Sequence, residues 1–567
     1  MMNAALHFLS VEVRGLQKVV YVLAAFALLS SILALVRDRL LAAAFGASTT
    51  LDLYYAAFRI PDLIFVGIGA LVSVYILIPE LVRRSDDEQR KYIDTIIVGF
   101  LILSVVSAAV AALFAPFFLA RLFPQFTLEG HLPQLVTLTR IILLQPLLLG
   151  FSNILAAITQ SRQRYILYAV SPLLYNLGII FGVVVLYPLW GASGLVWGVV
   201  AGAGLHASVQ VPAVIRDGFL RRLPQLWDWG ALLRTSSVSV PRALALSMNQ
   251  ITFLGLAALA GSLTSGSIAI FMFSYNLQAV PLSIIGASYS VAAFPTLALA
   301  LSKGQREEFI AHIAQAARYV FFWSLPVIAL IIVLRAHIVR VILGSGAFDW
   351  TDTRLTAAAL ALLALSLAAQ SVTLLIVRGY YAAGRTFVPF IVSLGMMVGT
   401  LGLATFFVSV VHNETLLRAM QILLRVEDLQ GTAVLTLVFA FSLLSIIGAV
   451  VLIFHFEYRF QGFLSRIIRA LGESIVAAFA AGVGAYIILI VVGPLTFAST
   501  TLSILSRGIL AGAFGILMAG IAYYLAGSRE FNETLEAVRG HIPFVKLPHG
   551  VVPITSSAEE TNPMITQ

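Results

Sequence analysis

The chain has 567 residues, of which 60% are hydrophobic and 11% are charged, and its formal net charge is +9. Soluble domains carry about 25% charged residues, so this composition and a mean hydropathy of +0.98 exclude a chain of separate soluble domains. We therefore predict an all-α polytopic membrane protein. No cysteine is present, which excludes disulfides and thiolate metal sites.

Apolar runs of about 20 residues or more, each long enough to cross a bilayer, predict about fourteen transmembrane helices. Pro61 and Pro79 predict a kink in the second. The runs lie at roughly 19–45, 54–81, 93–120, 135–160, 166–189, 191–214, 236–262, 267–300, 317–345, 353–382, 386–411, 432–456, 470–493 and 503–527.

Basic residues concentrate in every second loop, beginning with Arg14 and Lys18 before the first span and Arg83 and Arg84 after the second. Because loops rich in Lys and Arg stay on the cytoplasmic side, we predict that both termini are cytoplasmic and that the protein is multi-pass. The positive charge is then topological, and no nucleic-acid partner is expected.

The sequence also repeats itself. Residues 45–58 resemble 260–273, and Ile78-Pro79 resembles Phe294-Pro295, with an offset of 215 to 216 residues. Six spans separate the copies, so the repeats have the same orientation and predict two pseudo-symmetric six-helix lobes. Such lobes commonly enclose an alternately opened site; the alternative is that duplication only enlarged a scaffold.

These patterns divide the chain into six parts. No cleaved signal is expected at the N-terminus. The parts are a cytoplasmic lead at 1–18, a first lobe at 19–215, a cytoplasmic linker at 216–235, a second lobe at 236–457, two C-terminal helices at 458–528 and a mostly disordered cytoplasmic tail at 529–567.

One cluster of charges stands inside the apolar sequence of the first lobe: Arg37 and Asp38 in the first span, Asp52 after it and Arg59 in the second. An ionised group inside a membrane requires a partner or a wet cavity. Arg37 and Asp38 point about 100° apart on a helix, so at least one is expected to face the bundle or a cavity. The alternative is local pairing near the headgroups.

In the second lobe, Arg242 and Asn249 lie on the seventh span, where they are candidates for a cytoplasmic gate. Arg242 also suits a simple positive-inside anchor. Intramembrane amides such as Asn276 more often join helices than bind a ligand.

The sequence lacks three common motifs of nucleotide-binding proteins and hydrolases. The sequence has no Gly-x-x-x-x-Gly-Lys-Ser/Thr loop, no His-Glu-x-x-His and no Gly-x-Ser-x-Gly. We therefore expect a protein that is not an enzyme, with no catalytic residues, no metal site and no cofactor.

The runs Leu35-Val-Arg-Asp-Arg-Leu-Leu-Ala-Ala-Ala-Phe-Gly-Ala47 and Ala57-Phe-Arg-Ile-Pro-Asp-Leu63, with Asp52 between them, resemble the signature of the MurJ/MviN family of lipid II flippases. The similarity extends over most of residues 15–527. It implies fourteen helices in the bacterial inner membrane and transport of the undecaprenyl-pyrophosphate-linked peptidoglycan precursor to the outer leaflet. It also implies a central cavity for the pyrophosphate and sugars and a lipid-tail groove at the last two helices.

Carried over residue by residue, the resemblance makes Arg37, Asp38, Asp52 and Arg59 the candidate headgroup contacts. Ser31, Phe65 and Asn276 stand where the family has cavity cations or a tyrosine-rich pattern. Ser31 and Asn276 are accordingly weaker cavity candidates. Their loss puts the exact cargo in doubt.

Three functions therefore remain open: a lipid II flippase, a flippase for another lipid-linked oligosaccharide, and a non-transporting scaffold of an envelope-building complex. The expected partners are a lipid-linked glycan precursor, membrane lipids and peptidoglycan-synthesis proteins.

Overall fold

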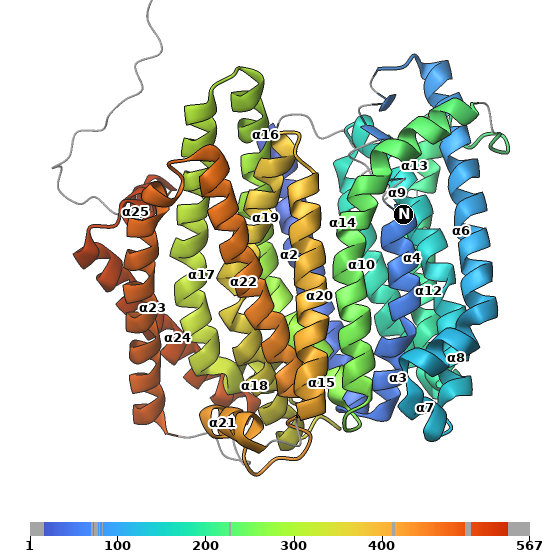
Figure 1. Ribbon diagram of the computed structural model, residues 1–567. Helices are drawn as coiled ribbons and strands as arrows, with labels where there is room; N and C mark the ends of the chain where they lie inside the picture. Colours follow the sequence, from blue (N-terminus) through green and yellow to red (C-terminus); the bar gives the residue numbers. More distant parts are fainter. Residues whose placement is uncertain are drawn as a thin grey trace, which may run out of the picture.

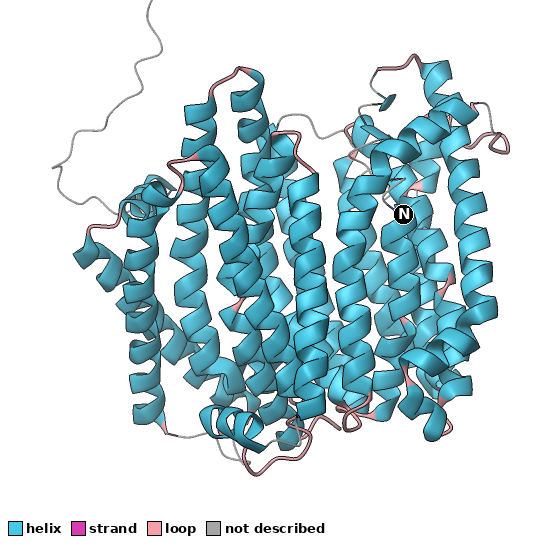
Figure 2. Ribbon diagram, in the orientation of Figure 1, coloured by secondary structure: helices cyan, strands magenta, loops and turns pink. Residues whose placement is uncertain are grey.

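A computed structural model describes residues 16–69, 72, 77–78, 80–81, 83–225, 228–410, 414–493 and 500–541. Within these ranges the regular structure is entirely helical (Figure 2). The predicted all-α class is confirmed.

The helices of the first lobe follow the predicted spans, several of which are broken into two or three pieces. They are α2 (Leu16–Phe45), α3 (Thr49–Ala57), α4 (Arg59–Gly69), α6 (Asp86–Leu122), α7 (Pro124–Leu128), α8 (Leu132–Ile142), α9 (Leu144–Ser161), α10 (Tyr165–Phe181), η1 (Gly182–Leu186), α11 (Tyr187–Trp190), α12 (Ala192–Ser208) and α13 (Val211–Arg216).

The second lobe and the C-terminal hairpin follow in the same way. Their helices are α14 (Trp229–Gly261), α15 (Ser267–Pro281), η2 (Leu282–Ala287), α16 (Ser288–Ser302), α17 (Arg306–Ile342), α18 (Trp350–Leu365), α19 (Leu367–Ala382), α20 (Phe387–Val410), α21 (Glu414–Leu424), α22 (Val434–Phe460), α23 (Leu464–Val492), α24 (Thr501–Ala526) and α25 (Arg529–His541).

Ten helices of the described chain are long and apolar enough to cross a membrane, and the pair α18–α19, bent by 43°, makes an eleventh. The other three predicted spans coincide with α2, with the broken pair α3–α4 and with α14. The count of fourteen stays a prediction. Large apolar side chains cover the outside of the bundle, such as Leu113, which is 70% exposed, and Phe479, which is 75% exposed. This surface suits lipid as the surrounding solvent.

The bundle has two ends. The basic end carries the loops at 83–85, 162–164, 217–225, 303–305, 383–386 and 461–463, together with α25. The far end carries the loops at 46–48, 262–266 and 343–349 and the short helices α7 and α21. Figure 1 shows the basic end at the top and the far end at the bottom.

The two lobes stand side by side, and α14 of the second lobe also packs against helices of the first lobe (Figure 1). Near its start it packs against α4 and α6 of the first lobe, where the hydroxyls of Tyr92 and Thr235 lie 3.1 Å apart. Towards its end it packs against α15 and α20. The hairpin of α23 and α24 lies against α17 at the outer edge of the second lobe (Figure 1).

Two predicted boundaries differ from the structure. The linker expected at 216–235 is shorter, because α13 ends at Arg216 and α14 already begins at Trp229. The tail expected to be mostly disordered begins with helix α25, whose Glu530 is 2.7 Å from the Arg318 guanidinium of α17. The polar composition of the tail did not predict this helix or its ion pair with α17. Residues 542–567 lie outside the described chain.

Candidate functional site

A cavity of about 150 Å³ lies between the lobes, in the half of the bundle nearer the far end. Arg37 and Asp38 of α2, Arg59 of α4 and Asn276 of α15 all line it. The structure thus brings together four of the predicted site residues. Three tyrosines that the sequence analysis did not single out, Tyr54, Tyr55 and Tyr175, complete the polar lining.

Arg37 and Asp38 form an ion pair at this cavity. The Arg37 Nη2 atom is 2.8 Å from Asp38 Oδ1, and Arg37 Nε donates to the same oxygen over 2.9 Å. Arg37 Nη1 also donates to Asn176 Oδ1 of the first lobe, while Asp38 Oδ2 accepts from Asn276 Nδ2 of the second lobe, each over 3.1 Å. Arg37 therefore contacts the first lobe and Asp38 the second, and both residues line the cavity.

Arg59 is held on the other side of the cavity. Its side chain is 7% exposed, its Nε donates to the Tyr55 carbonyl oxygen over 3.0 Å, and its Nη2 lies 3.9 Å from Asp62. A guanidinium has five N–H donors, so Arg59 keeps donors available for a ligand in the cavity. With Arg37, it gives the cavity two forks of the kind that bind phosphate oxygens.

Each arginine already has a carboxylate nearby, which limits the positive charge that a ligand would meet. An anion entering the cavity has to share Arg37 with Asp38 and Arg59 with Asp62. The local alternative of the sequence analysis is thus partly right: Arg37 pairs with its neighbour, but at a cavity.

Asp52, which was also predicted to contact the headgroup, has a different position from the cavity residues. It is 3% exposed and does not line the cavity. Its Oδ2 accepts from the Gly266 backbone N–H over 2.6 Å and its Oδ1 from that of Ala269 over 2.8 Å. These groups stand at the start of α15, where a helix leaves N–H groups unpaired and favours negative charge. Asp52 therefore joins the lobes rather than facing a ligand.

Further hydrogen bonds join the lobes at the far end. Together with the Asp52 contacts they form what we call the far-end seal, between residues 43–52 and residues 265–269 and 347–352. Ala47 N donates to Asp352 Oδ2 over 3.0 Å, and Ala347 N donates to the Ala43 carbonyl over 2.9 Å. Gly46 has φ +60°, and a Cβ there would lie 2.6 Å from the Ala347 carbonyl oxygen, so this approach requires glycine.

The hydroxyls of Thr49 and Ser265 lie 2.7 Å apart at the centre of the seal. The repeat matches residues 45–58 to 260–273 with an offset of 215 residues, so the equivalent of Thr49 is Thr264, the neighbour of Ser265. Nearly equivalent positions of the two copies therefore meet in the far-end seal.

The remaining predicted site residues lie elsewhere. Ser31 Oγ donates to the Ala27 carbonyl of its own helix over 3.0 Å and does not line the cavity. Asn249 lines a second cavity, inside the second lobe. Arg242 belongs to α14, but its side chain lies outside the described part of the chain. Neither gate assignment is tested by these positions.

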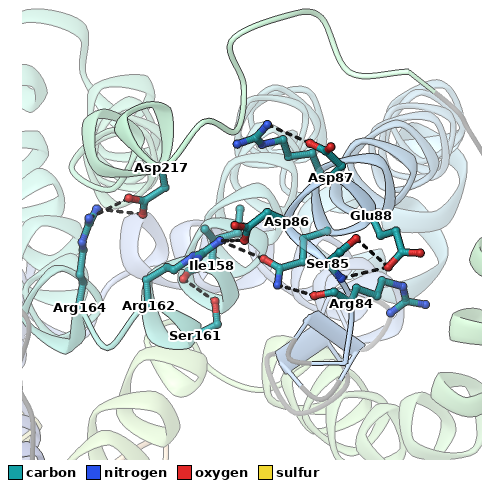
Figure 3. A network of polar contacts seen from close by, with 12 residues as sticks. Arg84, Ser85, Asp86, Asp87, Glu88, Ile158, Ser161, Arg162, Arg164 and Asp217 are labelled. Atoms are coloured by element: carbon teal, nitrogen blue, oxygen red, sulfur yellow. Dashed lines mark hydrogen bonds and ion pairs between the residues drawn. The ribbon is translucent and has the colours of Figure 1, made fainter.

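Arginines at the basic end of the first lobe are paired in a surface network (Figure 3). Arg162 Nη2 donates to Asp86 over 2.7 Å, and Arg164 lies 2.8 Å from Asp217. These contacts tie the α9–α10 loop to the start of α6 and to the end of α13. The network is structural and lies apart from the cavity. In the described chain, no group of three His, Asp or Glu side chains is arranged to hold a metal ion.

Comparison with known proteins agrees with this architecture. The family model described as "Lipid II flippase MurJ" matches residues 41–505. The chain belongs to the lipid II flippase MurJ family. The resemblance to this family is thereby confirmed, although Arg37 and Asp38 lie just before the matched residues.

Several curated relatives carry the same family name. The probable lipid II flippase MurJ of Buchnera aphidicola is 28% identical over 384 residues, covering 65% of this chain and 73% of that protein. The lipid II flippase MurJ of Burkholderia cenocepacia is 25% identical over 391 residues, covering 66% and 75%.

Solved structures show the same fold. A lipid II flippase MurJ in an inward closed conformation superimposes with a TM-score of 0.68 at 19% identity, covering 90% of this chain and 99% of that one. An inward-facing multidrug resistance MATE transporter of the MOP superfamily gives 0.61 at 14% identity, covering 77% and 96%. The chain is a multi-pass membrane protein with a transporter fold.

Proposed function

We propose that this protein moves a lipid-linked cell-wall precursor, with lipid II as the favoured cargo, from the inner to the outer leaflet of the bacterial cytoplasmic membrane. The observation that carries the proposal is the cavity between the lobes, into which Arg37 and Arg59 both reach. Membership of the lipid II flippase MurJ family supports the same cargo.

The basic end faces the cytoplasm in this proposal, because its loops carry the Lys and Arg residues that remain on that side. Both termini are then cytoplasmic, and the far-end seal closes the cavity towards the outside. Cargo enters from the inner leaflet, and release requires the seal to open. No bond is made or broken, so the protein acts as a transporter and not as an enzyme.

Arg37 and Arg59 bind the pyrophosphate in this scheme. Binding an anion replaces part of the contact of Arg37 with Asp38, and Asn176 and Asn276 keep the two side chains positioned during the exchange. Each charge-assisted hydrogen bond contributes about 1.5–3 kcal/mol, so loss of one arginine weakens anion binding by roughly tenfold to a hundredfold.

Complementation tests the proposal. The parent chain, Arg37→Ala and the control Arg469→Ala are expressed at equal abundance in bacteria depleted of their lipid II flippase. Arg469 is a suitable control because its side chain is 78% exposed and forms an ion pair with Glu473 of the same helix. We expect the parent and the control to restore growth and Arg37→Ala to fail. No growth with an abundant, membrane-inserted parent would overturn lipid II as the cargo.

A second cargo class is favoured by one observation. Asp38 and Asp62 offset the positive charge of the two cavity arginines. A lipid-linked oligosaccharide with less negative charge would suit such a cavity. If this is the cargo, the chain fails to complement the depleted bacteria but transports the lipid-linked oligosaccharide in reconstituted vesicles. If the chain is a non-transporting scaffold, it transports neither this lipid nor lipid II.

A further inference from the structure

A second cavity, of about 310 Å³, lies within the second lobe among α14, α15, α19, α20 and α22. It extends from the middle of the bundle towards the basic end, where Tyr381 and Pro389 line it. None of its described lining residues carries a charge. Its polar groups are hydroxyls and amides, including those of Asn249, Thr252, Gln370, Thr373, Ser393 and Tyr381.

The chemistry of this lining is mixed. The aromatic residues Tyr275 and Phe441 and the flexible side chains of Met396 and Met397 supply apolar surface beside the hydroxyls and amides. Pockets that bind small organic groups combine apolar walls with a few placed polar groups in this way. A pocket without charge gives no advantage to an anion or a cation, so the lining favours a neutral group rich in hydroxyls and amides.

The Gln370 amide keeps hydrogen-bonding capacity in the cavity. Its Nε2 donates to Ser366 Oγ over 2.8 Å, one turn earlier on the chain. An amide has two N–H donors and an acceptor oxygen, so this contact leaves groups that can pair with a polar ligand. The Thr373 hydroxyl oxygen, in contrast, is closed off from the cavity space.

Only one helix separates the two cavities. The consecutive residues Tyr275 and Asn276 of α15 point about 100° apart, so that Tyr275 lines the second cavity while Asn276 lines the first and donates to Asp38. The Tyr275 ring is held by Phe253, with the ring centroids 4.6 Å apart. A helix with its side chains is about 10–12 Å across, which is the span that one headgroup must cover to reach both cavities.

We infer that the second cavity binds the carbohydrate part of the same lipid-linked molecule whose pyrophosphate binds at Arg37 and Arg59. This inference rests on the proposed function and adds a separate specificity site to it. Anionic and neutral parts of the headgroup are then recognised in different lobes. Hydroxyl and amide groups that pair with a sugar discriminate against a molecule that lacks it, since they would be left unpaired.

A binding experiment with two probes tests the inference. The full chain is purified, and its affinity is measured for lipid II and for undecaprenyl pyrophosphate, which has the same anchor without the disaccharide and the peptide attached to it. The double variant Gln370→Leu/Ser393→Ala removes polar groups that line the second cavity with little change in volume. Both side chains are half-buried, so their replacement by apolar side chains is not expected to unfold the protein.

We expect the double variant to bind lipid II at least tenfold more weakly than the parent and to bind undecaprenyl pyrophosphate equally well. Arg37→Ala weakens both probes. Thr296→Val is the matched control, since its exposed hydroxyl bonds to the Ala293 carbonyl of its own helix and does not line the cavity. It should bind both probes like the parent.

Two results would overturn the inference, and they differ in what they say of the proposed function. If the double variant binds both probes like the parent, or weakens both equally, the second cavity does not recognise sugar, while binding of the pyrophosphate still stands. If the parent binds neither probe, the proposed cargo fails together with the inference.

Discussion

The carboxylate of Asp52 offers the sharpest test of how the lobes are held together. It accepts the backbone N–H groups of Gly266 and Ala269 across the lobe boundary. A hydrogen bond to a charged group contributes about 1.5–3 kcal/mol, so Asp52→Ala removes roughly 3–6 kcal/mol from the closed state. Part of this returns when water binds the freed N–H groups. A net loss of about 3 kcal/mol raises the population of the open state roughly a hundredfold.

Hydrogen–deuterium exchange measures this opening at amides that Asp52 does not touch. Ala47 N and Ala347 N also form cross-lobe hydrogen bonds in the far-end seal, to Asp352 and to Ala43. We expect Asp52→Ala to accelerate exchange at both amides by tenfold to a hundredfold. Asp86→Asn, which alters a carboxylate bonded to Arg162 within the first lobe, should leave them unchanged. Faster exchange confined to residues 266–269 would refute the reasoning and reduce Asp52 to a local helix cap.

Three further predictions concern stability. Gly198→Ala should lower the free energy of unfolding by about 1–3 kcal/mol, because a Cβ there would lie 2.3 Å from a backbone atom of η1. Gly204→Ala on the same helix has open space around its Cβ and should leave the free energy of unfolding unchanged. Thermal unfolding of the two variants measures the difference. Glu530→Gln leaves the α17 arginine without its buried partner, so α25 should exchange its amides faster, by an amount equivalent to about 3 kcal/mol. The Arg354 guanidinium lowers the pKa of Asp428 below 3.8, so their pair stabilises the fold above that pH and is lost as the pH falls through the folded-state pKa. The melting temperatures of the parent and Asp428→Asn should therefore differ at pH 7 and converge only when the pH falls well below 3.8.

The helices of this protein could be predicted from sequence because length and apolarity alone define a membrane span. Over the described residues, each predicted span coincides with a helix or a broken helix, from α2 to α24; the span predicted at 54–81 can be compared mainly as far as Gly69. The interruptions were harder to foresee. Pro281 directly precedes the π-helical turn η2, yet α10 continues past Pro172 and α17 past Pro326 without a break. Neighbouring helices decide whether a proline interrupts a helix, and the local sequence does not contain that information.

Part of the cavity lining could also be predicted from the sequence. Arg37, Asp38 and Arg59 were found because charges inside apolar runs are rare. Asn176 was not distinguished from other polar residues, since its role depends on a contact with α2 across 139 residues of chain.

Asp52 is the clearest example of a residue whose role could not be predicted from the sequence. It shares the family motif and the charge of the cavity residues, but its partners are two backbone N–H groups of the opposite lobe. Backbone groups have no signature in the sequence, so only the packing of the lobes could separate its role from that of Asp38.

The central claim is that this chain transfers lipid II across a bilayer with Arg37 and Arg59 as headgroup contacts. The most direct measurement is the initial rate at which fluorescent lipid II becomes accessible on the opposite leaflet of vesicles containing the purified chain. We predict transfer by the parent and by Arg469→Ala, and a rate at least tenfold lower for Arg37→Ala/Arg59→Ala. Transfer no faster than in empty vesicles, or an unchanged rate in the double variant, would contradict the account.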